Sequence, residues 1–410
     1  MRDSLPHIGL KDPWVPLQEK VRSEHLVVGL ALLYILLQFY FVTLDHYIDF
    51  DTHAKWGAQY FEGSLYPASG RIPYKDYSFN EYPVLSVYGW IVAYGLCPQP
   101  DDYFLLSVFM LFPYWILAAI GGICLLPLLR QRGFTDRYAL YIIAFYFFNP
   151  QNALDTARNH GSLGTFATVV IAYYLWTRQQ DASSAAVLAI GFGLKLYPIL
   201  LAPFLFIDAR NLQRQLRFSG SLLLSLLVIH LPVLPFFSEY LAVLQSGDQR
   251  RGGMSLADWI ADGGAMVGID NSEGLVFLVY LIGMTLIVCG ILPLTRVGGL
   301  EKFTLVYGAN CLLEPYSGIG HLLFVMILLT PIVFSPGLSL PPWQRVVFGG
   351  YLLLGAVYGL PLLGSYKYWP KYYIVALTGI FLLVTLYILG TRGPSVSEPM
   401  VPATKLTPRA

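Results

Sequence analysis

The sequence predicts an all-α membrane protein with roughly ten to twelve transmembrane helices and a polar cap on the non-cytoplasmic side. Three observations support this fold class. Of the 410 residues, 56% are hydrophobic and 12% are charged, whereas soluble domains carry roughly 25% charged residues. Long apolar runs recur along the chain, and the basic residues collect between them. The net charge of +1 argues against nucleic-acid binding, which needs a concentrated basic surface.

The expected spans are the apolar runs that approach the length of about 20 residues needed to cross a hydrocarbon layer of roughly 30 Å. They are Leu26–Leu44, Phe104–Leu129, Ser219–Phe237, Leu275–Leu294, Val346–Leu363 and Tyr372–Leu389. Shorter runs can cross only if polar flanking residues extend the helix or the bilayer thins locally. These are Tyr138–Phe148, Leu163–Trp176, Phe303–Leu313 and His321–Phe334. The first run is not followed by a small-residue cleavage site, so we expect a retained span and not a signal peptide.

The distribution of Lys and Arg predicts the orientation, because cytoplasmic loops carry an excess of these residues. With a cytoplasmic N-terminus, every basic loop lies inside if two segments do not cross the membrane. We expect Val84–Cys97 to be re-entrant or interfacial, and Ala185–Ile207 to be a hairpin of two half-spans broken at Pro198. The basic loops are Arg130–Arg137, Arg178, Arg210–Arg217, Arg296–Lys302 and the tail with Arg392. The outer segments are Asp45–Tyr82, Asn149–Ser162, Ser238–Gly274, Glu314–Gly320 and Gly364–Lys371.

We expect a single domain over residues 1–390, followed by a disordered tail, residues 391–410, which is rich in Pro, Ser and Thr. Both termini are then cytoplasmic. A prokaryotic cell membrane is the expected location in preference to the endoplasmic reticulum.

The first outer segment carries three carboxylates and two histidines within the nine residues from Asp45 to His53. A carboxylate at the membrane surface that faces an apolar cavity is a candidate general base, and Asp49 and Asp51 both qualify. The pair could instead bind a divalent cation, Mg²⁺ or Mn²⁺, through its oxygens. It could also reflect only the fact that acids do not cross membranes easily. An amphipathic helix is expected from Trp56 to a stop at Gly63, with Pro67 beyond it and Glu81 and Tyr82 further along.

Two further segments place charged residues beside or within apolar runs. The outer segment Asn149–Ser162 contains Arg158 and His160, and a basic residue, Lys195, lies two positions before Tyr197 in the expected broken helix. An unpaired ammonium in lipid costs at least about 2.5 kcal/mol. Lys195 is therefore a functional candidate, unless its side chain extends to the lipid headgroups.

Taken together, these segments resemble glycosyltransferases of the GT-C superfamily, in particular glycosyltransferase family 87 and the catalytic subunit of GPI mannosyltransferase I. The resemblance rests on three patterns in order: Asp-x-Asp with Glu-Gly-x-x-Tyr-Pro, Asn-Pro followed by Thr-x-Arg, and Lys-x-Tyr-Pro. It implies that a sugar, first of all mannose, is transferred with inversion from a polyprenyl-phosphate donor to a lipid or glycan acceptor. The implied roles are catalytic for Asp49 and Asp51, donor-phosphate binding for Arg158, Lys195, His160 and Tyr197, and substrate binding for His53, Glu81, Tyr82, Glu314 and His321.

Several alternatives stay open at the level of sequence. A secondary transporter or lipid flippase would also build its site from a broken helix with an internal charge, here around Lys195. A structural or regulatory membrane protein is a third class, which the combination of Asp49, Asp51, Arg158 and Lys195 disfavours. Within the transferase hypothesis we prefer Asp49 over Asp51 as the base, because the family pattern places an Asp four residues before an aromatic residue or His, here His53. The sugar, the acceptor and the need for a divalent cation are left open.

Overall fold

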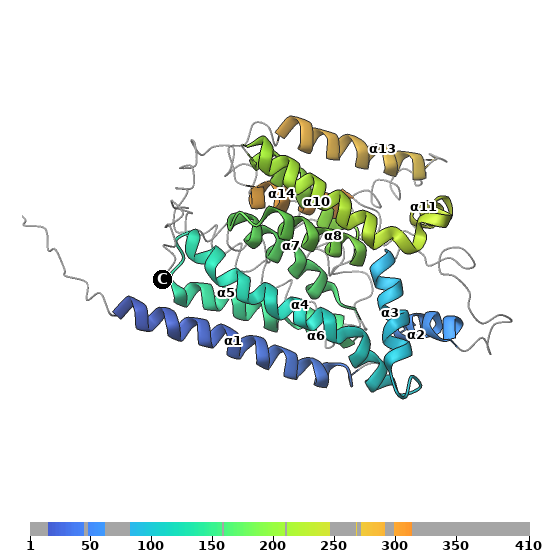
Figure 1. Cartoon of the computed structure of the whole chain (residues 1–410), viewed down its shortest axis with the longest axis horizontal. Coiled ribbons are helices and arrows are strands. Elements are labelled where there is room, and N and C mark those ends of the chain that lie inside the picture. Colours follow the sequence, from blue (N-terminus) through green and yellow to red (C-terminus); the bar gives the residue numbers. More distant parts are fainter. Residues whose placement is uncertain are drawn as a thin grey trace, which may run out of the picture. The chain divides into compact units, whose positions relative to one another are not determined.

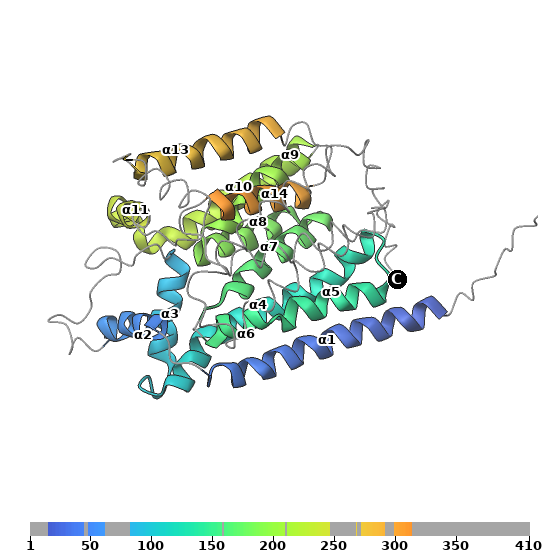
Figure 2. The same cartoon turned by 180° about the vertical axis from the view of Figure 1, so that it is seen from behind.

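The computed structural model describes residues 15–44, 48–61, 83–157, 160–209, 211–246, 268, 272–291 and 299–313. Every regular element in these ranges is helical, which confirms the all-α prediction for them (Figures 1 and 2). The chain divides into two compact units, one containing Met1–Arg250 and Leu323–Lys367, the other containing Arg251–Leu322 and Tyr368–Ala410. The single domain expected over residues 1–390 stays a prediction.

The helices of the first unit are α1 Val15–Phe41, α2 Ile48–Phe61, α3 Val84–Leu96, α4 Tyr103–Gln131, α5 Asp136–Phe148, α6 Pro150–Ala157, α7 Ser162–Thr177, α8 Asp181–Leu194, the 3₁₀ helix η1 Tyr197–Leu201, α9 Ala202–Asp208, α10 Leu212–His230, the 3₁₀ helix η2 Leu231–Phe236 and α11 Phe237–Ser246. The second unit contains α13 Ser272–Thr285, the π-helix η4 Leu286–Ile291 and α14 Gly299–Leu313. In that unit the hydroxyl of Tyr280 donates to Oδ1 of Asn310 at 2.8 Å, which joins α13 to α14.

Three helices in the described residues are long and apolar enough to cross a membrane: Arg22–Phe41, Tyr103–Gln131 and Leu212–Pro235. They correspond to the first three long runs of the sequence. The run Leu275–Leu294 overlaps α13 and η4. The runs Val346–Leu363, Tyr372–Leu389 and His321–Phe334 lie outside the described residues. The large apolar side chains exposed on α1 and α10 suit contact with lipid tails; they include Leu32, Leu36, Leu223, Leu224 and Val228.

Helices α4 and α7 run parallel and touch closely. A Cβ on Gly121 of α4 would lie 2.7 Å from Cβ of Ala167, and a Cβ on Gly164 of α7 would lie 2.3 Å from the carbonyl oxygen of Tyr114. Both contacts need glycine, because a larger residue would separate the helix axes. The carboxyl ends of α4 and α7 therefore lie on the same side of the unit.

Helix α8 returns antiparallel to α7. The hydroxyl of Ser184, near the start of α8, donates to the carbonyl of Ala172 at 2.8 Å. Near its end, a Cβ on Gly191 would lie 2.2 Å from Oγ1 of Thr168. The end of α8 therefore lies beside the beginning of α7.

Helices α8, η1 and α9 form the expected hairpin. Arg214 at the start of α10 binds Asp181 at the start of α8, with Nη2 2.6 Å from Oδ1. The next residue, Gln215, donates to the carbonyl of Phe206 near the end of α9 at 3.2 Å. Both ends of the hairpin thus lie beside the start of α10. Helix α8 ends at Leu194 and η1 begins at Tyr197, so the helix is interrupted at Lys195, close to Pro198 as predicted.

Three of the five basic loops belong to the first unit, and their described residues gather at one end of its helices. Arg130 at the end of α4 donates to Asp136 at the start of α5 at 2.8 Å and to Glu24 of α1 at 3.0 Å. Arg178 directly follows α7, which runs parallel to α4, and Arg214 lies beside the start of α8. The helix directions therefore agree with the predicted grouping of these loops on one side, and α2 and α3 lie at the opposite end of α1 and α4 (Figure 1).

One predicted helix boundary was wrong and two helices were missed, in each case because a polar stretch was read as a loop. Helix α2 begins at Ile48 and not at Trp56, since carboxylates in a first turn are favoured by the helix dipole. Helix α6 lies inside the expected loop Asn149–Ser162, where Pro150 has the backbone angle that a first helical position requires. Helix α11 lies inside the expected loop Ser238–Gly274, with Glu239 in its first turn.

Candidate functional site

The centre of the candidate site is a contact between Lys195 and Ser162. The ammonium of Lys195 donates to the hydroxyl of Ser162 at 2.8 Å. Lys195 follows the last residue of α8, and Ser162 is the first residue of α7. This contact joins the expected broken helix to the outer segment that contains Arg158 and His160.

The break in the α8–α9 hairpin has a simple cause. Proline has no backbone N–H, so Pro198 cannot donate to the carbonyl of Leu194, as residue 198 of a continuous helix would. Lys195 takes an extended conformation instead, with φ −150° and ψ 149°. The hydroxyl of Ser86 in α3 donates to the freed carbonyl of Leu194 at 2.5 Å. A side chain from another helix thus satisfies the carbonyl next to Lys195.

Asp155 in α6 binds the residues that lead into α7. Its Oδ2 accepts a hydrogen bond from the backbone N–H of Ser162 at 2.9 Å, and its carbonyl accepts one from the N–H of His160 at 2.8 Å. Nδ1 of His160 lies 3.6 Å from Oδ1 of Asp155. Arg158 lies outside the described residues; His160 and Ser162, which follow it in the chain, both bind Asp155, which precedes it.

The same segment is anchored to the helices beneath it. Thr156 is buried, and its hydroxyl donates to Oε1 of Gln38, which is buried in α1. Gly161 lies against the ring of Tyr114, where a Cβ would come within 2.3 Å of the ring atoms. The hydroxyl of Tyr114 lies 3.4 Å from Oγ of Ser86. Helices α1, α3, α4, α7 and α8 therefore all support the region around Lys195.

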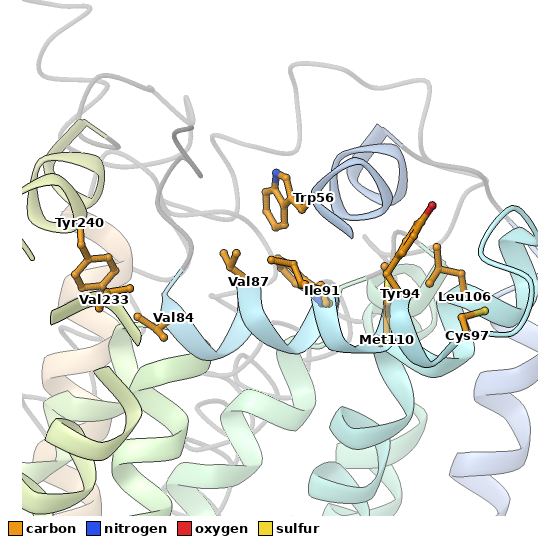
Figure 3. Close-up of a cluster of buried hydrophobic side chains, with 12 residues drawn as sticks. Trp56, Val84, Val87, Ile91, Tyr94, Cys97, Leu106, Met110, Val233 and Tyr240 are labelled. Atoms are coloured by element: carbon orange, nitrogen blue, oxygen red, sulfur yellow. The ribbon is translucent and has the colours of Figure 1, made fainter. Parts of the chain in front are cut away.

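A second group of side chains lies between α2 and α3. His53 is 1% exposed and stacks on Trp90 of α3, with 3.6 Å between ring centroids and 20° between planes. Trp56 packs beside both rings. Its apolar surroundings continue along α3 to Cys97 and to Val233 and Tyr240 beyond α10 (Figure 3). Burial raises the pKa of Tyr240 to about 12, so this phenol stays neutral and is not a candidate base.

The structure describes the side chains of four of the predicted site residues: His53, His160, Lys195 and Tyr197. Two of them lie near the start of α7: His160 contacts Asp155, Asp155 binds the backbone of Ser162, and the hydroxyl of Ser162 binds Lys195. Tyr197 begins η1 two residues after Lys195. Asp49 and Asp51 lie in α2, and nothing is described of their side chains; Glu81, Tyr82, Arg158, Glu314 and His321 lie outside the described residues.

Ser86, Asp155 and Ser162 were not predicted from the sequence as site residues. The loss of the N–H at Pro198 did signal that the carbonyl of Leu194 needs another donor, but it could not show which residue supplies it. Ser86 was unmarked because a lone serine in an apolar helix is common, and its partner lies far along the chain. Within the described ranges, no three His, Cys, Asp or Glu side chains are grouped as a metal site.

Comparison of the sequence with protein-family models and with curated proteins finds no match.

Proposed function

We propose that this chain is a polytopic membrane glycosyltransferase of the GT-C type that transfers a sugar, first of all mannose, from a polyprenyl-phosphate donor to a lipid or glycan acceptor. The active site faces the non-cytoplasmic side of a prokaryotic cell membrane, and both termini are cytoplasmic. Roughly ten to twelve helices cross the membrane.

The observation that carries the proposal is the 2.8 Å contact between Lys195 and Ser162. The resemblance to GT-C glycosyltransferases implies donor-phosphate binding by two separate segments, one around Arg158 and one around Lys195. Their meeting at one point supports that assignment, because a phosphate held by both cations requires them to be close. The meeting point also lies at the end of the helices away from Arg130, Arg178 and Arg214, as expected of a non-cytoplasmic site.

The length of α8 supports a site in the outer half of the membrane. Its 14 residues rise about 21 Å at 1.5 Å per residue, which is less than the roughly 30 Å of the hydrocarbon layer. A hairpin that enters from the basic side would thus carry Lys195 past the midplane without reaching the outer surface. That depth suits the phosphate of a donor whose polyprenyl chain lies in the lipid.

In the proposed reaction, the acceptor hydroxyl oxygen attacks the anomeric carbon of the sugar as its proton passes to the carboxylate of Asp49 or Asp51. The bond between that carbon and the phosphate oxygen breaks, and polyprenyl phosphate leaves with the electron pair. Arg158 and Lys195 stabilise the negative charge that grows on the phosphate. A single displacement inverts the anomeric configuration, so no covalent sugar–enzyme intermediate is needed, as in inverting glycosidases.

The test uses purified protein in lipid nanodiscs, radiolabelled polyprenyl-phosphate mannose and a membrane glycolipid extract. We expect the wild type to transfer label, one of Asp49→Ala and Asp51→Ala to lose transfer, and Lys195→Gln to lower it by about 100-fold. Lys55→Gln is the matched control, because it removes an exposed ammonium from α2. Absence of transfer with mannose, glucose, galactose and arabinose donors, each with and without Mg²⁺ or Mn²⁺, overturns the proposal in favour of a transporter.

A further inference from the structure

We infer that Ser86 and Ser162 are positioning residues that together hold Lys195, Ser86 through the backbone and Ser162 through the ammonium. This inference rests on the proposed function, in which the two serines keep the ammonium of Lys195 where the leaving phosphate forms. The two hydrogen bonds themselves do not depend on that function.

Ser162 acts on the charged group. Its hydroxyl accepts a hydrogen bond from the ammonium of Lys195 at 2.8 Å, and its side chain is buried. The backbone N–H of Ser162 is bound by Asp155, and the preceding Gly161 lies against Tyr114, so the hydroxyl projects from a well-anchored position. A long, flexible lysine side chain gains most from such a contact, because it otherwise has many rotamers of similar energy.

Ser86 acts on the backbone. It is buried in α3, and its hydroxyl donates at 2.5 Å to the carbonyl of Leu194, the residue before Lys195. Close packing limits the movement of this turn, because a Cβ on Gly193 would lie 2.8 Å from the side chain of Leu85. Ser86 lies in the first turn of α3, three residues after Pro83. It therefore links the start of α3 to the turn that carries Lys195.

A matched control separates this role from a purely structural one. Ser184 is buried in α8, the helix that ends just before Lys195, and its hydroxyl donates to the carbonyl of Ala172 at 2.8 Å. It makes the same kind of bond as Ser86 but lies near the other end of α8. Ser184→Ala should thus cost similar stability without changing Lys195.

The first measurement is independent of activity. Protein in nanodiscs is treated with an amine-acetylating reagent, and the acetylation rate at Lys195 is followed by peptide mass spectrometry. We expect Ser162→Ala to raise this rate about tenfold and Ser86→Ala about fivefold, because the amine is held less rigidly. Ser162→Thr, which keeps the hydroxyl, and Ser184→Ala should match the wild type. Rates in Ser162→Ala and Ser86→Ala that equal the Ser184→Ala rate overturn the inference.

The second measurement uses the transfer assay. Ser162→Ala and Ser86→Ala should raise the KM for the polyprenyl-phosphate donor by similar factors and leave the KM for the acceptor unchanged, while Ser184→Ala changes neither. A rise in both KM values, or equal losses in all three variants, contradicts the inference. If the wild type transfers no sugar, the proposed function fails, and the acetylation rates still decide whether the two serines hold Lys195.

Discussion

The guanidinium of Arg214 lies against the carboxylate of Asp181, with Nη2 2.6 Å from Oδ1 and Nε 3.0 Å from the same oxygen. The carboxylate is 1% exposed. The guanidinium also lies over the ring of Trp176, 4.2 Å from its centroid. This cluster joins the α7–α8 turn to the start of α10, and so it holds the base of the hairpin that carries Lys195.

Removal of this guanidinium should strongly destabilise the protein. Arg214→Ala leaves the buried carboxylate of Asp181 without its cation, which costs about 3–5 kcal/mol. Arg214→Lys should recover only part of this loss, because an ammonium has no planar face to stack on Trp176 and cannot bind as a fork. Thermal unfolding in detergent measures the loss of stability in both variants. Arg217→Ala, which removes an exposed arginine from the same helix, should lie within about 0.5 kcal/mol of wild type; equal losses in Arg214→Ala and Arg217→Ala would refute the prediction.

The contact between α4 and α7 predicts opposite effects for two Gly→Ala changes. At Gly164 a Cβ would lie 2.3 Å from the carbonyl oxygen of Tyr114, whereas at Gly220 in α10 nothing lies within 4 Å. Gly164→Ala should therefore lower stability by about 1–3 kcal/mol through overpacking, and Gly220→Ala should raise it by about 0.5–1 kcal/mol through helix propensity. Thermal unfolding of the two variants in one detergent measures the difference. A stabilising Gly164→Ala would show that the helices are farther apart than described.

The buried pair of Gln38 and Thr156 predicts a strong coupling between two substitutions. Thr156→Val leaves the amide oxygen of Gln38 buried without its hydroxyl donor, at a cost of about 1–3 kcal/mol. Replacing both partners with apolar residues, as Gln38→Leu with Thr156→Val, should cost less than the sum of the single changes. The measurement is a double-mutant cycle of unfolding free energies. Additive costs would mean that the two side chains do not interact.

The orientation of the helices predicts opposite labelling of two exposed loop positions. Gln99 lies between α3 and α4, and Gln180 lies between α7 and α8. In a background without the four native cysteines, Gln99→Cys should react with a membrane-impermeant thiol reagent applied from the non-cytoplasmic side. Gln180→Cys should react only after the membrane is permeabilised. Reaction of both from one side would contradict the orientation derived from the basic loops.

Among the described residues, the sequence predicted the positions of the apolar helices well, because apolar length and helix-ending residues are local properties. The run Leu163–Trp176 became α7, Ser162–Thr177, and the run Phe104–Leu129 became α4, Tyr103–Gln131. Polar helices were missed where carboxylates or a proline looked like loop residues, as in α6.

The candidate site was predicted only in part, because some of its residues are marked by their neighbours in the chain and others only by their contacts in the fold. Lys195 was found because a charge in an apolar run is costly, a property of one residue and its neighbours. The partners Ser86 and Ser162 depend on how α3 and α7 pack against α8. Serine is frequent and small, so periodicity carries no information about which serine meets a distant backbone carbonyl or ammonium.

The pairing of Pro198 with Ser86 also restricts how this protein can change over evolutionary time. A proline at position 198 leaves the carbonyl of Leu194 in need of a donor, and the hydroxyl at position 86 has that carbonyl as its acceptor. Loss of the hydroxyl alone removes the donor to this part-buried carbonyl, whereas replacement of the proline alone costs no hydrogen bond, because a carbonyl oxygen can accept two. Homologous chains that keep the proline should therefore also keep a hydroxyl at position 86, while chains without the proline are free to lose it, so that the constraint runs in one direction between two helices.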